Sequence, residues 1–165
     1  MVRAVEAFLG SNLAGRQVAV LGAGAAARSI IYALGQAGVG QIVVVNRSSV
    51  SAEKAAALAS IAEVGAPQDI QEAELIINAT SVGMAGGPAE AEIPLNEDLL
   101  KPDQSVIDIV YNPIDTALLE AARAKGCAAL DGRAMLLHQA ALSIEAWTKN
   151  VAPLDVLQNS LDRSD

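Results

Sequence analysis

A short apolar run that leads into closely spaced glycines is the feature that most constrains this fold. The run Gln17–Leu21 is followed at once by Gly22-Ala23-Gly24-Ala25-Ala26-Ala27, a Gly-x-Gly-x-x-Ala pattern. Residues 25–37 then repeat apolar side chains at helical spacing. Because small residues permit a tight turn from a strand into a helix, this segment predicts the first βα unit of a parallel sheet.

The rest of the chain alternates between β-branched runs and Ala- and Leu-rich runs. We expect further strands at 41–45, 74–78 and 105–110, weaker ones at 62–64 and 127–129, and helices at 52–60, 116–125 and 135–147. Asp115 or Thr116 could cap the second of these helices, and one more short helix could follow Pro153. Such alternation indicates right-handed βαβ units. The sequence therefore predicts an α/β fold, with a Rossmann-type doubly wound parallel sheet in three α/β/α layers and residues 1–165 as a single domain.

Charge and composition exclude several kinds of partner. The net charge is −8, which would repel nucleic acid and anionic membranes. No run approaches the roughly 18 apolar residues that a membrane span needs. Cys127 is the single cysteine, which fits a reduced, cytoplasmic location and forbids an internal disulfide. We expect no nucleic-acid partner, no membrane partner and no metal site.

The glycine turn predicts a dinucleotide site. Gly22 permits the turn, Gly24 lets a pyrophosphate approach the backbone, and Ala27 keeps the helix close to the sheet. The alternative is a tight turn that binds nothing, but the strand before it and the helix after it favour cofactor binding. The predicted contacts in this turn are Gly22, Ala23, Gly24, Ala25 and Ala26.

The end of the second strand predicts which dinucleotide binds. NAD-binding domains carry Asp or Glu there, whereas this chain has Asn46-Arg47-Ser48 and no acid before Glu53. A guanidinium can pair with a 2′-phosphate and stack on adenine. The alternative is a solvated surface arginine. The pattern favours NADP(H), with Asn46, Arg47 and Ser48 as contacts.

Three further motifs, taken with the glycine turn and residues 46–48, resemble one family. Residues 78–84 read Asn-Ala-Thr-Ser-Val-Gly-Met, residues 108–113 read Asp-Ile-Val-Tyr-Asn-Pro, and residues 131–140 read Asp-Gly-Arg-Ala-Met-Leu-Leu-His-Gln-Ala. In this order and at this spacing they resemble the C-terminal NADP-binding domain of shikimate dehydrogenases. That resemblance implies reduction of 3-dehydroshikimate to shikimate in the pathway to aromatic amino acids.

The resemblance also implies roles for individual residues. Thr80, Ser81 and Val82 would line the cofactor groove, and Ile109, Gly132 and Met135 would lie near the nicotinamide. Tyr111 and Gln139 would face a neighbouring domain and contact shikimate. The single histidine, His138, is interpreted as helix packing or surface, because Gln139 holds the family's ligand position. Met84 is interpreted as a gap-filler in the core, and Trp147 as an apolar anchor for the last helix.

Two departures from the family pattern shape the functional hypothesis. Ala25 stands where glycine is frequent, and no second basic residue closely follows Arg47, since Ser51 occupies that region and Lys54 is the nearest cation. The substrate domain, which supplies a Lys–Asp pair for proton transfer, is not matched, so we expect no catalytic residue here and an isolated chain that is inactive. The surface that would face the substrate domain could self-associate and form a homo-oligomer. The alternative functions are a freestanding NADP-binding module, a subunit completed in trans, and a quinate-type or glutamyl-tRNA-reductase-like enzyme.

Overall fold

The computed structural model describes residues 1–162, in which six parallel strands form one sheet. The strands are β1 (Gln17–Leu21), β2 (Gln41–Val45), β3 (Ala62–Val64), β4 (Leu75–Asn78), β5 (Ser105–Asp108) and β6 (Ala128–Leu130). The helices are α1 (Val2–Leu9), α2 (Ala25–Gln36), α3 (Ser49–Ala56), α4 (Ala117–Ala124), α5 (Arg133–Thr148) and α6 (Leu154–Asp162), with the short 3-10 helices η1 (Pro67–Glu72) and η2 (Glu97–Leu99).

The strand order is β3-β2-β1-β4-β5-β6, so the chain leaves β3 at one edge and re-enters beside β1. All five pairings are parallel, and Leu21 lies opposite Val45 on one side and Asn78 on the other. The order reverses between β1 and β4. Ligands of doubly wound sheets bind at the carboxyl ends of the strands beside such a reversal.

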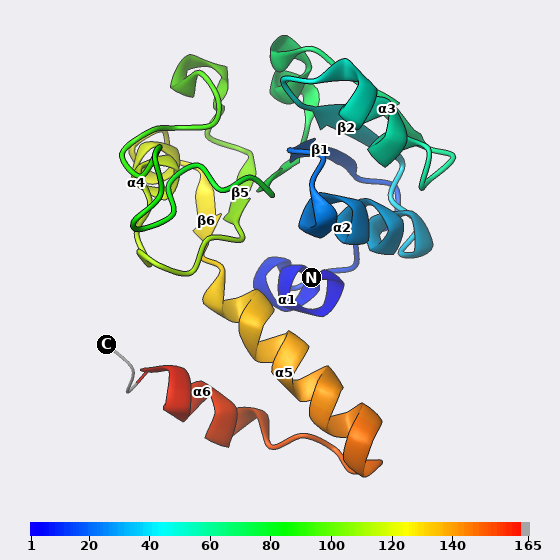
Figure 1. Ribbon diagram of the computed structural model, residues 1–165, viewed down its shortest axis with the longest axis vertical. Coiled ribbons are helices and arrows are strands. Elements are labelled where there is room, and N and C mark those ends of the chain that lie inside the picture. The colour runs from blue at the N-terminus through cyan, green and yellow to red at the C-terminus, as the bar shows by residue number, and fades with distance from the viewer. Residues whose placement is uncertain (163–165) are drawn as a thin grey trace.

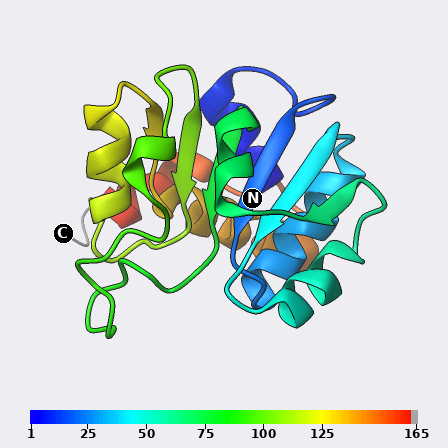
Figure 2. The same ribbon diagram turned by 90° about the horizontal axis from the view of Figure 1, so that it is seen from above.

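Alternate side chains of the strands divide the core into two layers. Val18, Val20 and Ile77 pack with residues of α2 and α3 on one face. Ala19 and Ile76 pack with residues of η1 and α4 on the other. Figure 2 shows the strands side by side between these helices. The predicted α/β fold, a doubly wound parallel sheet of Rossmann type, is confirmed.

Helix α5 follows β6 and extends beyond the sheet, and α6 folds back along it (Figure 1). We interpreted Trp147 from the sequence as an apolar anchor for the last helix, and that interpretation is wrong. Its side chain lies on the projecting end of α5 and is 81% exposed, with Val151 also exposed beyond it. Among residues 1–162, none of the helices has the length and apolar character needed to cross a bilayer.

The predicted elements are present, with their ends displaced for local reasons. Helix α3 begins at Ser49 rather than Ala52, because the Ser48 side chain accepts a hydrogen bond from the Ser51 amide and caps the helix. Thr116, rather than Asp115, caps α4. Strand β5 ends at Asp108 because the next free amide, that of Val110, donates to the Asp108 carboxylate instead of continuing the ladder.

Candidate cofactor site

The glycine turn after β1 lies at the carboxyl end of the sheet, and its two glycines have different surroundings. Gly22 has φ +107°, its amide donates to the carbonyl of Val45 at 2.9 Å, and a Cβ there would meet the Ala79 carbonyl oxygen at 2.8 Å. A Cβ on Gly24 would meet nothing within 4 Å. Gly22 is therefore required by packing, whereas Gly24 leaves open space at the start of α2.

That open space continues into a cavity of about 470 Å³ above β1, β2 and β4, which we call the arginine cavity. It is lined by Leu21, Gly22, Ala23, Gly24, Val45, Asn46, Arg47, Gly65, Pro67, Ala79, Thr80, Ser81, Val82 and Pro94. None of these residues is acidic, and Arg47 is the one charged side chain among them. The cavity therefore suits an anion that lies across the glycine turn.

Asn46, Arg47 and Ser48 have distinct placements at the end of β2. The side-chain amide of Asn46 donates a hydrogen bond to the backbone carbonyl of Ser48 at 3.0 Å and so fixes the turn. Ser48 caps α3 and does not line the cavity. The Arg47 side chain is exposed, lines the cavity and has no ion-pair partner within residues 1–162. Of the three predicted residues, Arg47 is the one placed to meet a ligand's charge.

A second cavity, of about 460 Å³, adjoins the first and is called here the tyrosine cavity. Its lining comprises Gly24, Ala25, Ala26, Ala79, Thr80, Ser81, Met84, Ala85, Ile109, Val110, Tyr111 and Asn112. It shares Gly24, Ala79, Thr80 and Ser81 with the arginine cavity. The two cavities thus form one groove across the reversal point of the sheet, with Gly24 in the middle.

A buried polar network positions the loops beneath this groove. Asn78 and Asp108 lie opposite each other at the ends of β4 and β5, and the side-chain nitrogen Nδ2 of Asn78 donates to Asp108 Oδ1 at 2.9 Å. Asn78 Oδ1 accepts from the Thr80 amide at 3.0 Å and from the Thr80 hydroxyl at 2.7 Å. Asp108 also accepts from the Val110 amide at 3.0 Å and from the Thr116 hydroxyl at 2.8 Å. Both loops of the tyrosine cavity are therefore tied to one pair of side chains.

Burial raises the pKa of the Asp108 carboxyl, and the hydrogen bonds from Val110, Thr116 and Asn78 oppose that rise. Asn78 and Asp108 are fully buried, and no buried side-chain nitrogen or oxygen within residues 1–162 lacks a partner. A satisfied network of this kind rigidifies the loops that it connects.

Gly132 precedes α5 as its N-cap, and Met135 and Gln139 lie in the first half of that helix. The Gly132 amide donates to the Val110 carbonyl at 3.1 Å, and a Cβ at Gly132 would clash with two carbonyl oxygens, those of Ile109 and Val110. Glycine is thus required for this close approach. Met135 and Gln139 line a third cavity, of about 530 Å³ between α1, α2 and α5, which meets the tyrosine cavity at Ala26.

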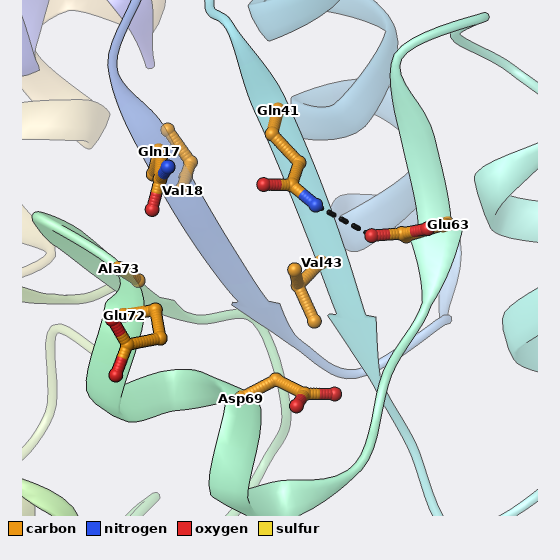
Figure 3. Close-up of a pocket in the computed structure, with 8 residues that line it drawn as sticks. All are labelled: Gln17, Val18, Gln41, Val43, Glu63, Asp69, Glu72 and Ala73. Carbon is orange, nitrogen blue, oxygen red and sulfur yellow. Dashed lines mark hydrogen bonds between the residues drawn. The ribbon is translucent and has the colours of Figure 1, made fainter.

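A further cavity, of about 360 Å³, lies near the amino-terminal ends of β1 and β2 and beside η1 (Figure 3). Glu63, Asp69 and Glu72 line it, and Glu63 accepts a hydrogen bond from Gln41. Its carboxylates would repel a phosphate. No three His, Cys, Asp or Glu side chains in residues 1–162 are grouped to hold a metal ion.

The cavities include residues that the sequence analysis missed. We interpreted Met84 as a core residue, but its side chain is 45% exposed and lines the tyrosine cavity beside Ala85 and Asn112. The Ala85 amide donates to the Asn112 carbonyl at 2.8 Å, which joins the two loops. The signal available in the sequence was the glycine-rich stretch after Met84, which indicated a loop of functional length.

Comparison with known proteins identifies the family. The model for "Shikimate / quinate 5-dehydrogenase" matches residues 4–109. This chain belongs to that family. A relative from Moorella thermoacetica named shikimate dehydrogenase (NADP(+)) is 39% identical over 163 residues, which is 92% of this chain and 55% of the relative. The chain spans about half the length of the curated relatives that it matches.

Solved structures of the family agree with the fold. Shikimate 5-dehydrogenase from Listeria monocytogenes, in complex with shikimate and NAD, has a TM-score of 0.87 and 34% identity, and the match covers 96% of this chain and 60% of that one. The Thermus thermophilus enzyme, in complex with NADP(H) and shikimate, has a TM-score of 0.86 and 32% identity, and the match covers 99% and 60%.

Proposed function

We propose that residues 1–165 form a single NADP(H)-binding domain of a shikimate dehydrogenase. The observation that carries the proposal is the continuous groove formed by the arginine and tyrosine cavities, which has Gly24 at its centre and Arg47 at one end. A relative from Methylobacterium radiotolerans that is 45% identical is named an NADP(+) enzyme, which supports the same assignment.

The residues of the groove fit a dinucleotide. The free amides at the start of α2 would meet the pyrophosphate at Gly24, where a side chain would fill the space that the phosphates need. Asn46 and Arg47 would hold the adenosine end. Ile109 and the loop at Thr80 would hold the nicotinamide end, with Ala23, Ala25, Ala26, Ser81, Val82, Gly132 and Met135 completing the contacts and Ser48 shaping the loop.

Arg47 supports NADP(H) over NAD(H). It lies in a cavity without a carboxylate, so the 2′-phosphate would meet a guanidinium and no repelling charge. The Listeria enzyme was solved with NAD, so the family's groove accepts both cofactors in structures. Preference for NADP(H) in this chain would therefore come from the charge at position 47.

When bound, NADPH supplies the hydride that reduces a carbonyl group. Tyr111 is 57% exposed at the edge of the tyrosine cavity, and Gln139 is exposed in the cavity beside it. Both side chains can donate a hydrogen bond to a substrate oxygen. We propose that they contact shikimate when a substrate domain covers these cavities.

We further propose that the 165-residue chain alone does not catalyse the oxidation of shikimate. No Lys, His, Asp or Glu side chain lines the tyrosine cavity within residues 1–162. His138 lies on α5 near Arg3 and the N-terminal amine, and burial together with those charges lowers its pKa. Within residues 1–162, no carboxylate, imidazole or amine that could take the proton of the substrate hydroxyl therefore faces the nicotinamide end of the groove. A freestanding cofactor-binding subunit completed in trans shares these features and stays a second candidate.

The proposal is tested by calorimetric titration of the chain with NADPH. We expect saturable binding of one NADPH per chain. The absence of saturable binding up to about 1 mM, the weak end of the range for specific ligands, would contradict the assignment of the groove.

A further inference from the structure

The α2–β2–α3 segment is basic within an acidic protein. Residues 25–56, from the start of α2 to the end of α3, contain three cations, Arg28, Arg47 and Lys54, and one acid, Glu53, although the whole chain has a net charge of −8. Six of the ten Lys and Arg side chains in residues 1–162 form ion pairs with carboxylates, and none of the six lies in this segment. The cations of this segment are thus left without protein counter-ions in the part of the chain that the structure describes.

Arg28 lies on α2 one turn after Gly24, the residue that both halves of the groove share. Its amide donates to the Gly24 carbonyl at 3.0 Å, and its side chain is exposed. Long helical side chains lean toward the helix N-terminus. The guanidinium of Arg28 is therefore carried back toward the glycine turn rather than away from it.

The helical repeat indicates which side of α2 Arg28 occupies. Gly35 is seven residues on, and seven residues bring a helix to within about 20° of the same face. A Cβ on Gly35 would meet the side chain of Ala59 at 2.9 Å, and Ala59 lies in the turn that follows the end of α3, so this face turns toward that end. Because α2 and α3 cover the same face of a parallel sheet, they run in the same direction. Arg28 accordingly faces the start of α3, which directly follows Arg47.

The glycine turn and the Arg47 loop are also joined directly. The Gly22 amide donates to the Val45 carbonyl, two residues before Arg47. A dianion held above Val45 would have the start of α2 on one side and Arg47 on the other. The sequence pattern lacks a second basic residue closely following Arg47, and Arg28 is the cation that this arrangement supplies from a different element.

We propose that Arg28 is a second determinant of cofactor specificity, and that it forms with Arg47 a two-arginine clamp for the 2′-phosphate of NADP(H). The inference rests on the proposed function of the groove. Two guanidinium groups suit a phosphate dianion better than one, because each offers paired N–H donors. Since both side chains are exposed, their attraction for the phosphate weakens with salt.

The test compares NADP+ with NAD+, which differ only in the 2′-phosphate, by calorimetry on the wild-type chain and on Arg28→Gln. We expect the substitution to weaken NADP+ binding about fivefold to tenfold, between the effect of an exposed ion pair and that of a charge-assisted hydrogen bond. NAD+ affinity should change less than about twofold, and Arg28→Lys should restore part of the NADP+ preference. Lys54→Gln is the matched control, since it removes a cation of the same segment and should leave both affinities unchanged.

The outcomes separate this inference from the proposed function. If the wild-type chain prefers NADP+ and Arg28→Gln keeps the whole preference, or if Lys54→Gln loses it instead, the Arg28 assignment is wrong while the groove assignment stands. If the wild-type chain binds neither cofactor, both are wrong. A weaker salt dependence of NADP+ binding in Arg28→Gln than in the wild type would support the clamp.

Discussion

The Thr116 hydroxyl donates a 2.8 Å hydrogen bond to Oδ2 of Asp108, and the Thr116 hydroxyl oxygen accepts a hydrogen bond from the Leu119 amide at 3.3 Å. One hydroxyl therefore caps α4 and satisfies a buried carboxylate. Through Asp108 and Asn78 the connection continues to the Thr80 loop. The start of α4 and the floor of the proposed cofactor groove are parts of one hydrogen-bonded structure.

Replacement of Thr116 by Val should destabilise the chain by about 2–4 kcal/mol. The change removes a helix cap and leaves one oxygen of a buried carboxylate without its donor. Thr116→Ser keeps the hydroxyl and should cost less than about 1 kcal/mol. Urea unfolding followed by circular dichroism measures both, and equal losses for Val and Ser would show that the hydroxyl does not act as described.

Stability should depend on pH through Asp108. Burial raises its pKa above the usual 3.8, so the folded state holds this proton more tightly than the unfolded state. The contribution of this raised pKa to the free energy of unfolding is fully present at pH below 3.8, the usual pKa, and is lost as the pH rises through the pKa of the folded state. The unfolding free energy of the wild type minus that of Asp108→Asn should therefore fall with rising pH across this window. A difference that increases with pH would mean that the carboxylate is stabilised on folding.

The two glycines of the turn should separate folding from binding. Gly24→Val should keep the thermal stability and weaken NADPH binding at least tenfold, because the side chain enters the open space of the groove. Gly22→Val should cost about 1–3 kcal/mol of stability, because φ is +107° and the Cβ meets a backbone oxygen. Thermal unfolding and fluorescence titration of both variants test this. Unchanged NADPH affinity in a folded Gly24→Val would place the phosphates elsewhere.

The sequence was sufficient to predict the fold because the decisive signals are local. The glycine turn, the buried strands and their alternation with helices each depend on residues adjacent in the chain. The predicted ends of helices and strands were less accurate. The start of α3 depends on the Ser48 cap, and the end of β5 depends on the Val110 amide, which donates to the Asp108 carboxylate instead of to a neighbouring strand.

Contacts between distant segments could not be predicted in this way. Asn78 and Asp108 lie thirty residues apart, and only the strand order makes them neighbours. Trp147 was expected to pack inward because it is large and apolar, yet α5 projects beyond the sheet. Met84 was likewise assigned to the core, although the turn places it on the groove. Apolar character indicates a tendency to be covered and does not identify what covers it.

The isolated chain should not oxidise shikimate with NADP+ at a measurable rate. Tyr111 can orient a substrate, but no carboxylate, imidazole or amine lines the tyrosine cavity within residues 1–162. Loss of acid–base assistance alone commonly lowers rates about 10²–10⁴-fold. NADPH formation at 340 nm measures this, and addition of a family substrate domain in trans should restore some turnover. Saturable turnover by the chain alone would direct attention to His138 as the base.

The most direct test of the central claim is the affinity of NADPH and NADH for the wild type and for Arg47→Ala. The account predicts that the wild-type chain binds NADPH more tightly and that Arg47→Ala costs NADPH about 1–3 kcal/mol, the range for a hydrogen bond to a charged group. NADH affinity should be nearly unchanged, because NADH has no 2′-phosphate. Equal losses for the two cofactors, or a wild type that does not distinguish them, would contradict the assignment of Arg47 and of the groove that it borders.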